Sequence, residues 1–149
     1  MKDTFHIDRE DAIMAYDYEV ITDDFSRAGE ASSDIKKKLR QVGIDNDIIR
    51  RIAISTYEAE INQVIHSLGG RITLLIRPDR IELFFVDRGP GIENIELAMK
   101  EGFSTASNKV REMGFGAGMG LPNIKRCSDE FYIESEVGSF TKLKIVINL

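Results

Sequence analysis

Three polar residues recur every four positions in the middle of the chain: Glu58, Asn62 and His66. If this segment is a helix, the spacing places the three side chains in one row along one face. A carboxylate and an amide oxygen in such a row suit Mg²⁺, which takes oxygen ligands and retains waters or phosphate oxygens. The row therefore indicates a metal, water or phosphate site. Ordinary hydrogen bonding between successive helical turns is the alternative.

Two glycine-rich motifs follow this row. The first, Asp87-Arg88-Gly89-Pro90-Gly91, comes directly after an apolar run. Its glycines let the backbone turn sharply and approach a ligand, and its aspartate is placed to accept a hydrogen bond from an exocyclic amine. The second motif alternates glycine with other residues just before a predicted helix: Gly114, Gly116, Gly118 and Gly120. Exposed N–H groups at a helix start form a natural phosphate site, whereas a tight turn and a mobile loop are the alternatives.

The elements that position these motifs follow from periodicity and turn residues. Helical patterns predict one helix ended by Gly43, with an N-cap at Ser32, Ser33 or Asp34, and a second from Asp45 or Asn46 to Leu68. The second helix is expected to bury one apolar stripe: Ile54, Tyr57, Ile61, Val64, Ile65 and Leu68. Strands are expected at Ile13–Ile21, Arg71–Arg77, Arg80–Val86, Phe131–Glu136 and Thr141–Asn148, and short helices at Glu93–Lys100 and from Pro122 to Asp129. This order predicts an α/β fold, an α+β sandwich with a largely antiparallel mixed sheet and helices on one face.

Composition sets the class of protein. A chain of 149 residues with 42% hydrophobic and 30% charged residues suits one globular domain, covering 1–149. The net charge of -5 argues against a nucleic-acid or anionic-membrane partner. One cysteine, no signal-like start and no long apolar run favour a cytoplasmic protein. A basic cluster is interpreted as a solvated helix face: Lys36, Lys37, Lys38, Arg40, Arg50 and Arg51.

Taken in order, the motifs resemble those of the GHKL ATPase superfamily, which has the Bergerat (histidine-kinase-like ATPase) fold. Within it, the chain resembles the anti-sigma-factor serine/threonine kinases from roughly Tyr16 to Asn148, and residues 1–15 are interpreted as an N-terminal extension. Glu58-Ala59-Glu60-Ile61-Asn62 resembles the N box, and Asp87, Gly89 and Gly91 resemble the first glycine box. The second glycine box is matched by Gly116-Ala117-Gly118-Met119-Gly120-Leu121, and the last box by Gly138-Ser139-Phe140-Thr141.

The resemblance implies a role for each matched residue in binding ATP and Mg²⁺. Asn62 is the implied metal ligand and Glu58 the general base, with His66 following them in the nucleotide site. Asp87 is implied to bind the adenine amine, Gly89 and Gly91 to shape its pocket, and Thr141 to support it. The residues implied to bind the phosphates are Gly116, Gly118, Gly120 and Leu121. A lid around Gly102 to Met113 is expected to include Ser104 and Thr105, with Lys109 or Arg111 as the γ-phosphate contact.

By this resemblance, the chain is a kinase that phosphorylates a serine on a STAS-like anti-anti-sigma partner and regulates a sigma factor, as a homodimer. Three alternatives stay open. A switch that holds ATP without transferring phosphate would not require a carboxylate at Glu58. A fragment of a histidine sensor kinase needs a phospho-accepting helix, and the stretch around His6 is short and irregular. A hydrolase of the chaperone or topoisomerase kind needs further domains.

Overall fold

The computed structural model describes residues 3–100 and 120–149. The chain runs through β1 (Met14–Val20), a short 3-10 helix η1 (Phe25–Arg27), α1 (Glu30–Gln41) and α2 (Asn46–His66). It continues through β2 (Gly70–Ile76), β3 (Arg80–Arg88), α3 (Ile95–Ala98), α5 (Gly120–Cys127), β4 (Glu130–Glu136) and β5 (Phe140–Asn148). The predicted elements are all present, with boundaries that differ by a few residues.

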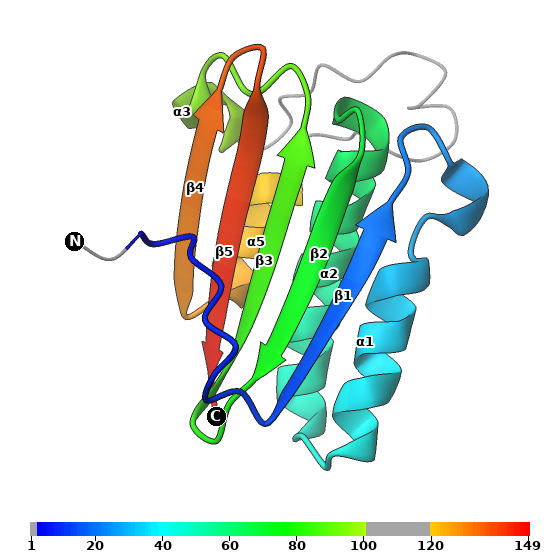
Figure 1. Cartoon of the computed structure of the whole chain (residues 1–149), viewed down its shortest axis with the longest axis vertical. Coiled ribbons are helices and arrows are strands. Elements are labelled where there is room, and N and C mark those ends of the chain that lie inside the picture. Colours follow the sequence, from blue (N-terminus) through cyan, green and yellow to red (C-terminus); the bar gives the residue numbers. More distant parts are fainter. Residues whose placement is uncertain (1–2, 101–119) are drawn as a thin grey trace.

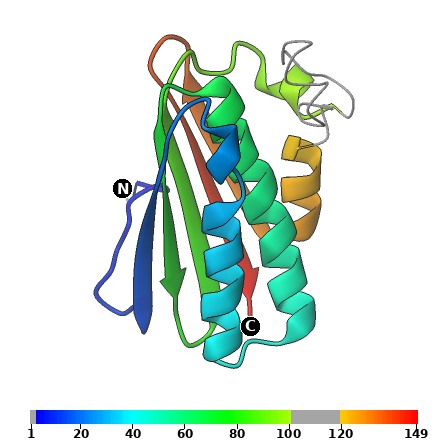
Figure 2. The ribbon, with the colours of Figure 1, turned by 90° about the vertical axis from the view of Figure 1, so that its right-hand side faces the viewer.

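The described strands form one five-stranded sheet in the order β1-β2-β3-β5-β4, and every neighbouring pair in it is antiparallel. The helices α1, α2 and α5 lie on one face of this sheet (Figures 1 and 2). Because side chains alternate along a strand, every second residue points into the core between sheet and helices. These fully buried core residues include Ile72, Leu74, Ile81, Leu83 and Ile145. The fold class is the predicted one.

The central helix α2 begins where the sequence predicts, because the Asp45 carboxylate caps it by accepting the backbone N–H of Asp47 at 3.2 Å. Its buried stripe, however, is rotated from the predicted one. Ile54, Tyr57 and Leu68 keep 42%, 40% and 70% of their surface exposed, whereas Ile61 and Val64 are buried as expected. Although α2 has 21 residues, none of the described helices combines the length and the apolarity that a membrane span requires.

The first helix starts earlier than the predicted N-caps at Ser32, Ser33 or Asp34. Its N-cap is Gly29, and α1 begins at Glu30. The reason is tertiary: the buried carboxylate of Glu60 on α2 accepts the backbone N–H groups of Ala31 and Ser32 at 3.1 and 2.9 Å. A carboxylate at the positive end of a helix satisfies donors that a local side chain otherwise caps.

The segment before β1 runs along the face of the sheet opposite the helices (Figures 1 and 2). Arg9 forms a two-pronged ion pair with Asp17 of β1, with both distances 2.9 Å. Arg77 at the end of β2 donates to the backbone carbonyl of Asp8 and is also paired with the buried Glu82. Residues 3–13 are therefore tied to the sheet by these two arginines.

Candidate functional site

The predicted polar row lies on α2, whose register places Glu58 and Asn62 on the side that faces α5. Both residues are half-buried, while His66 at the last position of α2 is exposed. Protein atoms around the His66 imidazole nevertheless desolvate it and lower its pKa. Eight residues separate Glu58 from His66, which is about 12 Å along a helix axis. The row therefore spans two distinct ends of a site.

One end of the site lies where α2 meets the first residue of α5. A Cβ atom added to Gly120 would lie 3.2 Å from Asn62 Nδ2 and 3.3 Å from both Asn62 Oδ1 and Glu58 Oε2. The side chains of Glu58 and Asn62 thus converge on the Gly120 backbone, in the space that a larger residue at 120 would fill. The first backbone N–H groups of α5, which have no partner within their own helix, and the positive end of the helix dipole lie at this helix start. The arrangement brings a carboxylate, an amide and an anion-binding helix end together.

Asn123 on α5 belongs to the same group of residues as Glu58, Asn62 and Gly120. Burial raises the pKa of the Glu58 carboxyl, and a side-chain hydrogen bond from Asn123 lowers it in part. Asn123 was not singled out from the sequence. It follows Gly120 by three positions and so shares a helix face with it, which is the signal that was available.

The amide oxygen of Asn62 fits a Mg²⁺ ligand in chemistry and in place. Magnesium sites commonly use one or two protein oxygens and complete the shell with water and phosphate oxygens. In the described part of the chain, no three His, Cys, Asp or Glu residues are grouped closely enough to hold a metal by themselves. A site completed by nucleotide phosphates is therefore the arrangement that these residues suit.

The other end of the site is built around Asp87, near the end of β3. Burial raises the pKa of Asp87 to about 6, against an ordinary value of 3.8. One carboxylate oxygen, Oδ1, accepts the backbone N–H of Thr141 at 3.2 Å, which partly offsets that shift. Asp87 and Thr141 are paired across β3 and β5, so both side chains lie on the face of the sheet that carries the helices.

Thr141 continues a short chain of hydrogen bonds on the same face. Its Oγ1 lies 3.0 Å from Ser135 Oγ on β4, and that oxygen accepts the backbone N–H of Ile92 at 2.7 Å. Ser135 was not predicted from the sequence, although it is the cross-strand partner of Thr141. This network connects Asp87, through Thr141 and Ser135, to the loop that carries the first glycine motif.

The two glycines of that loop are required by close backbone contacts. A Cβ on Gly89 would lie 3.1 Å from Ser67 Cα at the end of α2. Gly91 has a φ of +74°, and a Cβ there would lie 2.4 Å from the carbonyl oxygen of Glu136. The loop is also bonded to the β4–β5 turn, since Gly138 donates to the Pro90 carbonyl at 2.8 Å. Because these two positions carry no Cβ, the loop can lie in close contact with both the end of α2 and the β4–β5 turn, beside Asp87.

The remaining predicted residues divide into two groups. Leu121 is half-buried and packs against the hydrophobic core. The residues predicted for the lid and for most of the second glycine box lie outside the described residues: Ser104, Thr105, Lys109, Arg111, Gly116 and Gly118. The structure thus brings together Glu58, Asn62 and Gly120 at one end and Asp87, Gly89, Gly91 and Thr141 at the other.

Comparisons with known proteins identify the family to which the chain is similar. The family profile described as histidine kinase-, DNA gyrase B-, and HSP90-like ATPase matches residues 51–149, which include both ends of the site. The serine/threonine-protein kinase RsbT of Bacillus subtilis (strain 168) is 32% identical over 100 residues, 64% of this chain and 69% of that protein. An anti-sigma F factor of Clostridium beijerinckii is 30% identical over 105 residues, 66% of this chain and 70% of that protein.

Two solved structures share the fold. The RsbU and RsbW domains of Rv1364c from Mycobacterium tuberculosis give a TM-score of 0.58 at 15% identity, over 88% of this chain and 32% of that one. A chain of the SiaB-SiaC complex from Pseudomonas aeruginosa gives 0.60 at 14% identity, over 93% of this chain and 91% of that one. At these identities the likeness concerns the fold.

Proposed function

The chain belongs to the family of histidine kinase-, DNA gyrase B- and HSP90-like ATPases, and we propose that it is a serine/threonine protein kinase of the anti-sigma type that uses ATP and Mg²⁺. The names of its relatives, a serine/threonine-protein kinase and several anti-sigma F factors, support this proposal. Its substrate is then a serine of a STAS-like anti-anti-sigma protein, and its regulatory target is a sigma factor. As part of the proposal, the whole chain forms one cytoplasmic ATP-binding domain with an N-terminal extension at residues 1–15, and it acts as a homodimer.

The observation that carries this proposal is the convergence of Glu58 and Asn62 on the backbone of Gly120. Phosphoryl transfer needs little covalent chemistry from the protein, and catalysis depends mainly on positioning and charge stabilisation. The α5 N-terminus suits phosphate oxygens, and Asn62 would hold Mg²⁺ beside them. When bound, Mg²⁺ would neutralise charge that develops on the phosphates. Gly116 and Gly118 are proposed to extend this phosphate site.

Glu58 has the properties of a general base for the acceptor serine. Burial raises its pKa, so its carboxylate holds a proton more strongly than a solvated glutamate does. In the proposed step, Glu58 takes the hydroxyl proton as the serine oxygen forms a bond to the γ-phosphorus. The bond between that phosphorus and the β–γ bridging oxygen breaks, and ADP leaves with the electron pair. Glu58 then returns its proton to solvent.

Asp87 is proposed to recognise the adenine amine at the other end of the site. Its Oδ1 is engaged by the Thr141 backbone, which orients the carboxylate. Gly89 and Gly91 hold the neighbouring loop close to α2 and to the β4–β5 turn, and Thr141 supports the same wall. His66 and Leu121 are proposed to contact the nucleotide between these ends, and Ser104 and Thr105 to close over it.

The test is transfer of labelled phosphate from [γ-³²P]ATP to a purified STAS-domain protein from the same genome. Wild-type protein with Mg²⁺ should label a serine of that protein. Glu58→Gln should reduce the transfer rate by about 10²- to 10⁴-fold, the usual effect of losing a positioned base. Its ATP affinity, measured by calorimetry, should stay close to wild type. Asn62→Ala should instead weaken ATP binding, and more so with Mg²⁺ than without it.

The outcomes separate the alternatives. Full transfer by Glu58→Gln would remove Glu58 as the base. Magnesium-dependent ATP binding without any transfer by the wild type would favour an ATP-binding switch over a kinase. Equal ATP affinity of Asn62→Ala and wild type in Mg²⁺ would remove Asn62 as the metal ligand.

A further inference from the structure

The basic cluster of α1 and α2 is only partly used within the described structure. Arg51 donates to the backbone carbonyl of Cys127 and forms an ion pair with Asp129 at 3.0 Å. Lys38 lies over the ring of Tyr16, 5.2 Å from its centroid. Three other cations of the cluster line a common groove: Lys36, Arg40 and Arg50.

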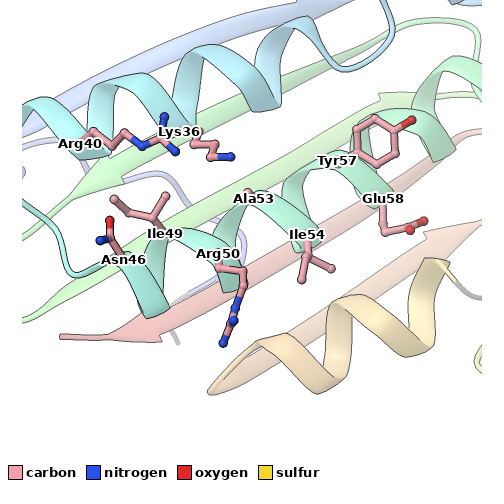
Figure 3. A pocket seen from close by; sticks show the side chains of 9 residues that line it. All are labelled: Lys36, Arg40, Asn46, Ile49, Arg50, Ala53, Ile54, Tyr57 and Glu58. Carbon is pink, nitrogen blue, oxygen red and sulfur yellow. The ribbon is translucent and has the colours of Figure 1, made fainter.

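This groove, which we call the α1–α2 groove, has a volume of about 610 Å³. Lys36 and Arg40 reach it from α1, and the rest of its lining, including Arg50, Ile54 and Tyr57, comes from α2 (Figure 3). Ile54 and Tyr57 belong to the predicted stripe, and the rotation of α2 leaves both of them exposed. An apolar surface with a basic rim therefore remains open on the helical face of the molecule.

The charges on the rim are available to a partner. Within the described residues, no carboxylate oxygen is paired with Lys36 or Arg40. Arg50 has an ion pair with Asp47 at 3.6 Å, in which both side chains are more than 70% exposed. Such an exposed pair contributes little and is readily exchanged. The groove thus offers positive charge on a chain whose net charge is -5.

The groove also reaches the site described above. Glu58 lines the groove (Figure 3), and its Oε2 is the atom that would lie 3.3 Å from a Cβ on Gly120. A chain segment seated along Ile54 and Tyr57 consequently ends beside the carboxylate that is proposed to act as base. A groove that ends at the proposed base is therefore in a position to bind a macromolecular substrate and to bring its acceptor hydroxyl to Glu58.

We propose that the α1–α2 groove binds an acidic segment with apolar side chains on the protein substrate, and that this docking delivers the acceptor hydroxyl to Glu58; the second half of this inference rests on the proposed kinase function. Acidic side chains pair with Lys36, Arg40 and Arg50, and apolar ones cover Ile54 and Tyr57. A nucleic acid is the less suitable occupant, because its phosphate backbone has no apolar groups to cover the exposed Ile54 and Tyr57 side chains. Rim charges act mainly on association rate and salt dependence.

The first experiment measures binding directly, without phosphoryl transfer. A fluorescein-labelled amphipathic peptide of glutamate and leucine is titrated with the full chain, and anisotropy is recorded. The same peptide with lysine at each glutamate position and a single-stranded oligothymidylate serve as probes of the other occupants. The acidic peptide should bind saturably, and more weakly as NaCl is raised. No saturable binding, equal binding of the lysine peptide, or tighter binding of oligothymidylate would overturn the proposal.

Variants with matched controls locate the binding. The double variant Lys36→Glu/Arg40→Glu should weaken the acidic peptide by about tenfold or more, since two attractions become repulsions. Lys37→Glu reverses one charge, as Lys36→Glu does by itself, on an exposed neighbour outside the groove. It should stay within about threefold of wild type, whereas Lys36→Glu alone should weaken binding by more than that. Ile54→Ser should weaken binding, whereas Ile13→Ser, at a residue 62% exposed elsewhere, should not. Equal effects of groove and control variants would refute the location.

Transfer kinetics then test delivery to Glu58. With the STAS-domain protein as substrate, the double variant should raise KM with little change in kcat, because docking is lost and the reacting groups are intact. An equal loss of ATP affinity would instead assign the groove residues to the nucleotide site. If the wild type transfers nothing while the peptide results hold, the kinase proposal fails and the groove stands. If transfer proceeds with an unchanged KM in the double variant, the groove fails by itself.

Discussion

The carboxylate of Glu58 and the backbone of Gly120 occupy adjoining space: a Cβ on Gly120 would lie 3.3 Å from Glu58 Oε2. These residues are 62 positions apart in the sequence, and the packing of α5 against α2 brings them together. The same added Cβ would lie 3.2 Å from Asn62 Nδ2. Both distances are shorter than ordinary van der Waals contacts, so glycine at 120 is what lets the two side chains keep their positions.

Gly120→Ala should therefore weaken Mg-ATP binding while leaving the fold intact. The added methyl group displaces the Asn62 and Glu58 side chains by a few tenths of an ångström, so the proposed metal ligand leaves its position and affinity should fall by about tenfold, which is about 1.4 kcal/mol. Calorimetric titration with Mg-ATP measures the loss, and urea unfolding provides the control. A Gly120→Ala protein with wild-type affinity would show that the two side chains do not need their observed positions.

Asn123→Ala should change the pH dependence of phosphoryl transfer. The hydrogen bond from Asn123 stabilises the ionised form of Glu58 and so lowers its pKa. Without that bond the pKa rises further, and the acid limb of the rate profile should move to higher pH. The measurement is the single-turnover transfer rate at saturating ATP across a pH series. A lower rate at every pH with no movement of the acid limb would mean that Asn123 only supports the packing of α5.

Glu60→Gln should destabilise the fold, in contrast to Glu58→Gln. Glu60 is 3% exposed and accepts two backbone N–H groups at the start of α1. Glutamine retains one acceptor oxygen and directs its NH₂ group at the second donor, which should cost about 1–3 kcal/mol of unfolding free energy. Urea unfolding of both variants makes the comparison. Equal stability of Glu60→Gln and wild type would mean that the cap contributes nothing to α1.

This contrast marks a limit of the sequence pattern. A helical wheel places Glu60 away from Glu58 and suggests that it tolerates change, but it does not show that α1 begins at that carboxylate. The same limit explains the rotation of α2. Ser55 and Thr56 are buried because each hydroxyl donates to a carbonyl of its own helix, Arg51 at 3.0 Å and Ile52 at 2.6 Å. The spacing of apolar residues treats Ser55 and Thr56 as solvent-facing and so predicts that Ile54 and Tyr57 lie on the buried face.

Local features, by contrast, were predictable. Asp45 caps α2 as its position before the helix suggests, and Gly91 adopts the positive φ that a turn after a strand favours. Which residues form the site was predictable in part, because the members of the polar row, and those of each glycine motif, lie close together in the sequence. Asn123 and Ser135 were missed because their roles depend on which strand or helix packs beside them.

The half-buried position of Asp87 implies opposite effects of one substitution on stability and on binding. Its pKa of about 6 in the folded protein lies above the ordinary value of 3.8, so burial favours the neutral carboxyl. The contribution of Asp87 to stability is therefore greatest below about pH 4 and is lost as the pH rises through about 6. Asp87→Asn stays neutral and can still accept the Thr141 N–H. At pH 7 it should be more stable than wild type by about 1 kcal/mol, a value reduced for partial solvent exposure.

The same Asp87→Asn protein should bind ATP more weakly. A carboxylate that accepts from the adenine amine is replaced by an amide that presents a donor on one side, and a hydrogen bond to a charged group is typically worth about 1.5–3 kcal/mol, or roughly 10- to 100-fold in affinity. The preference of the Asp87→Asn protein for ATP over GTP should be smaller than that of the wild type, since guanine carries a carbonyl where adenine has the amine.

The ATP affinity of the wild type should also fall, relative to that of Asp87→Asn, as the pH drops through about 6, because protonation of Asp87 removes the acceptor. Comparing the two proteins at each pH cancels the titration of the nucleotide itself. Asp79→Asn, in the β2–β3 turn, is the control for a lost carboxylate. Calorimetry with ATP and GTP between pH 5 and pH 8 measures all three effects. Two results would show that Asp87 does not bind the adenine amine. One is equal affinity of the wild type for ATP and GTP. The other is a ratio between the ATP affinities of wild type and Asp87→Asn that stays constant from pH 5 to pH 8.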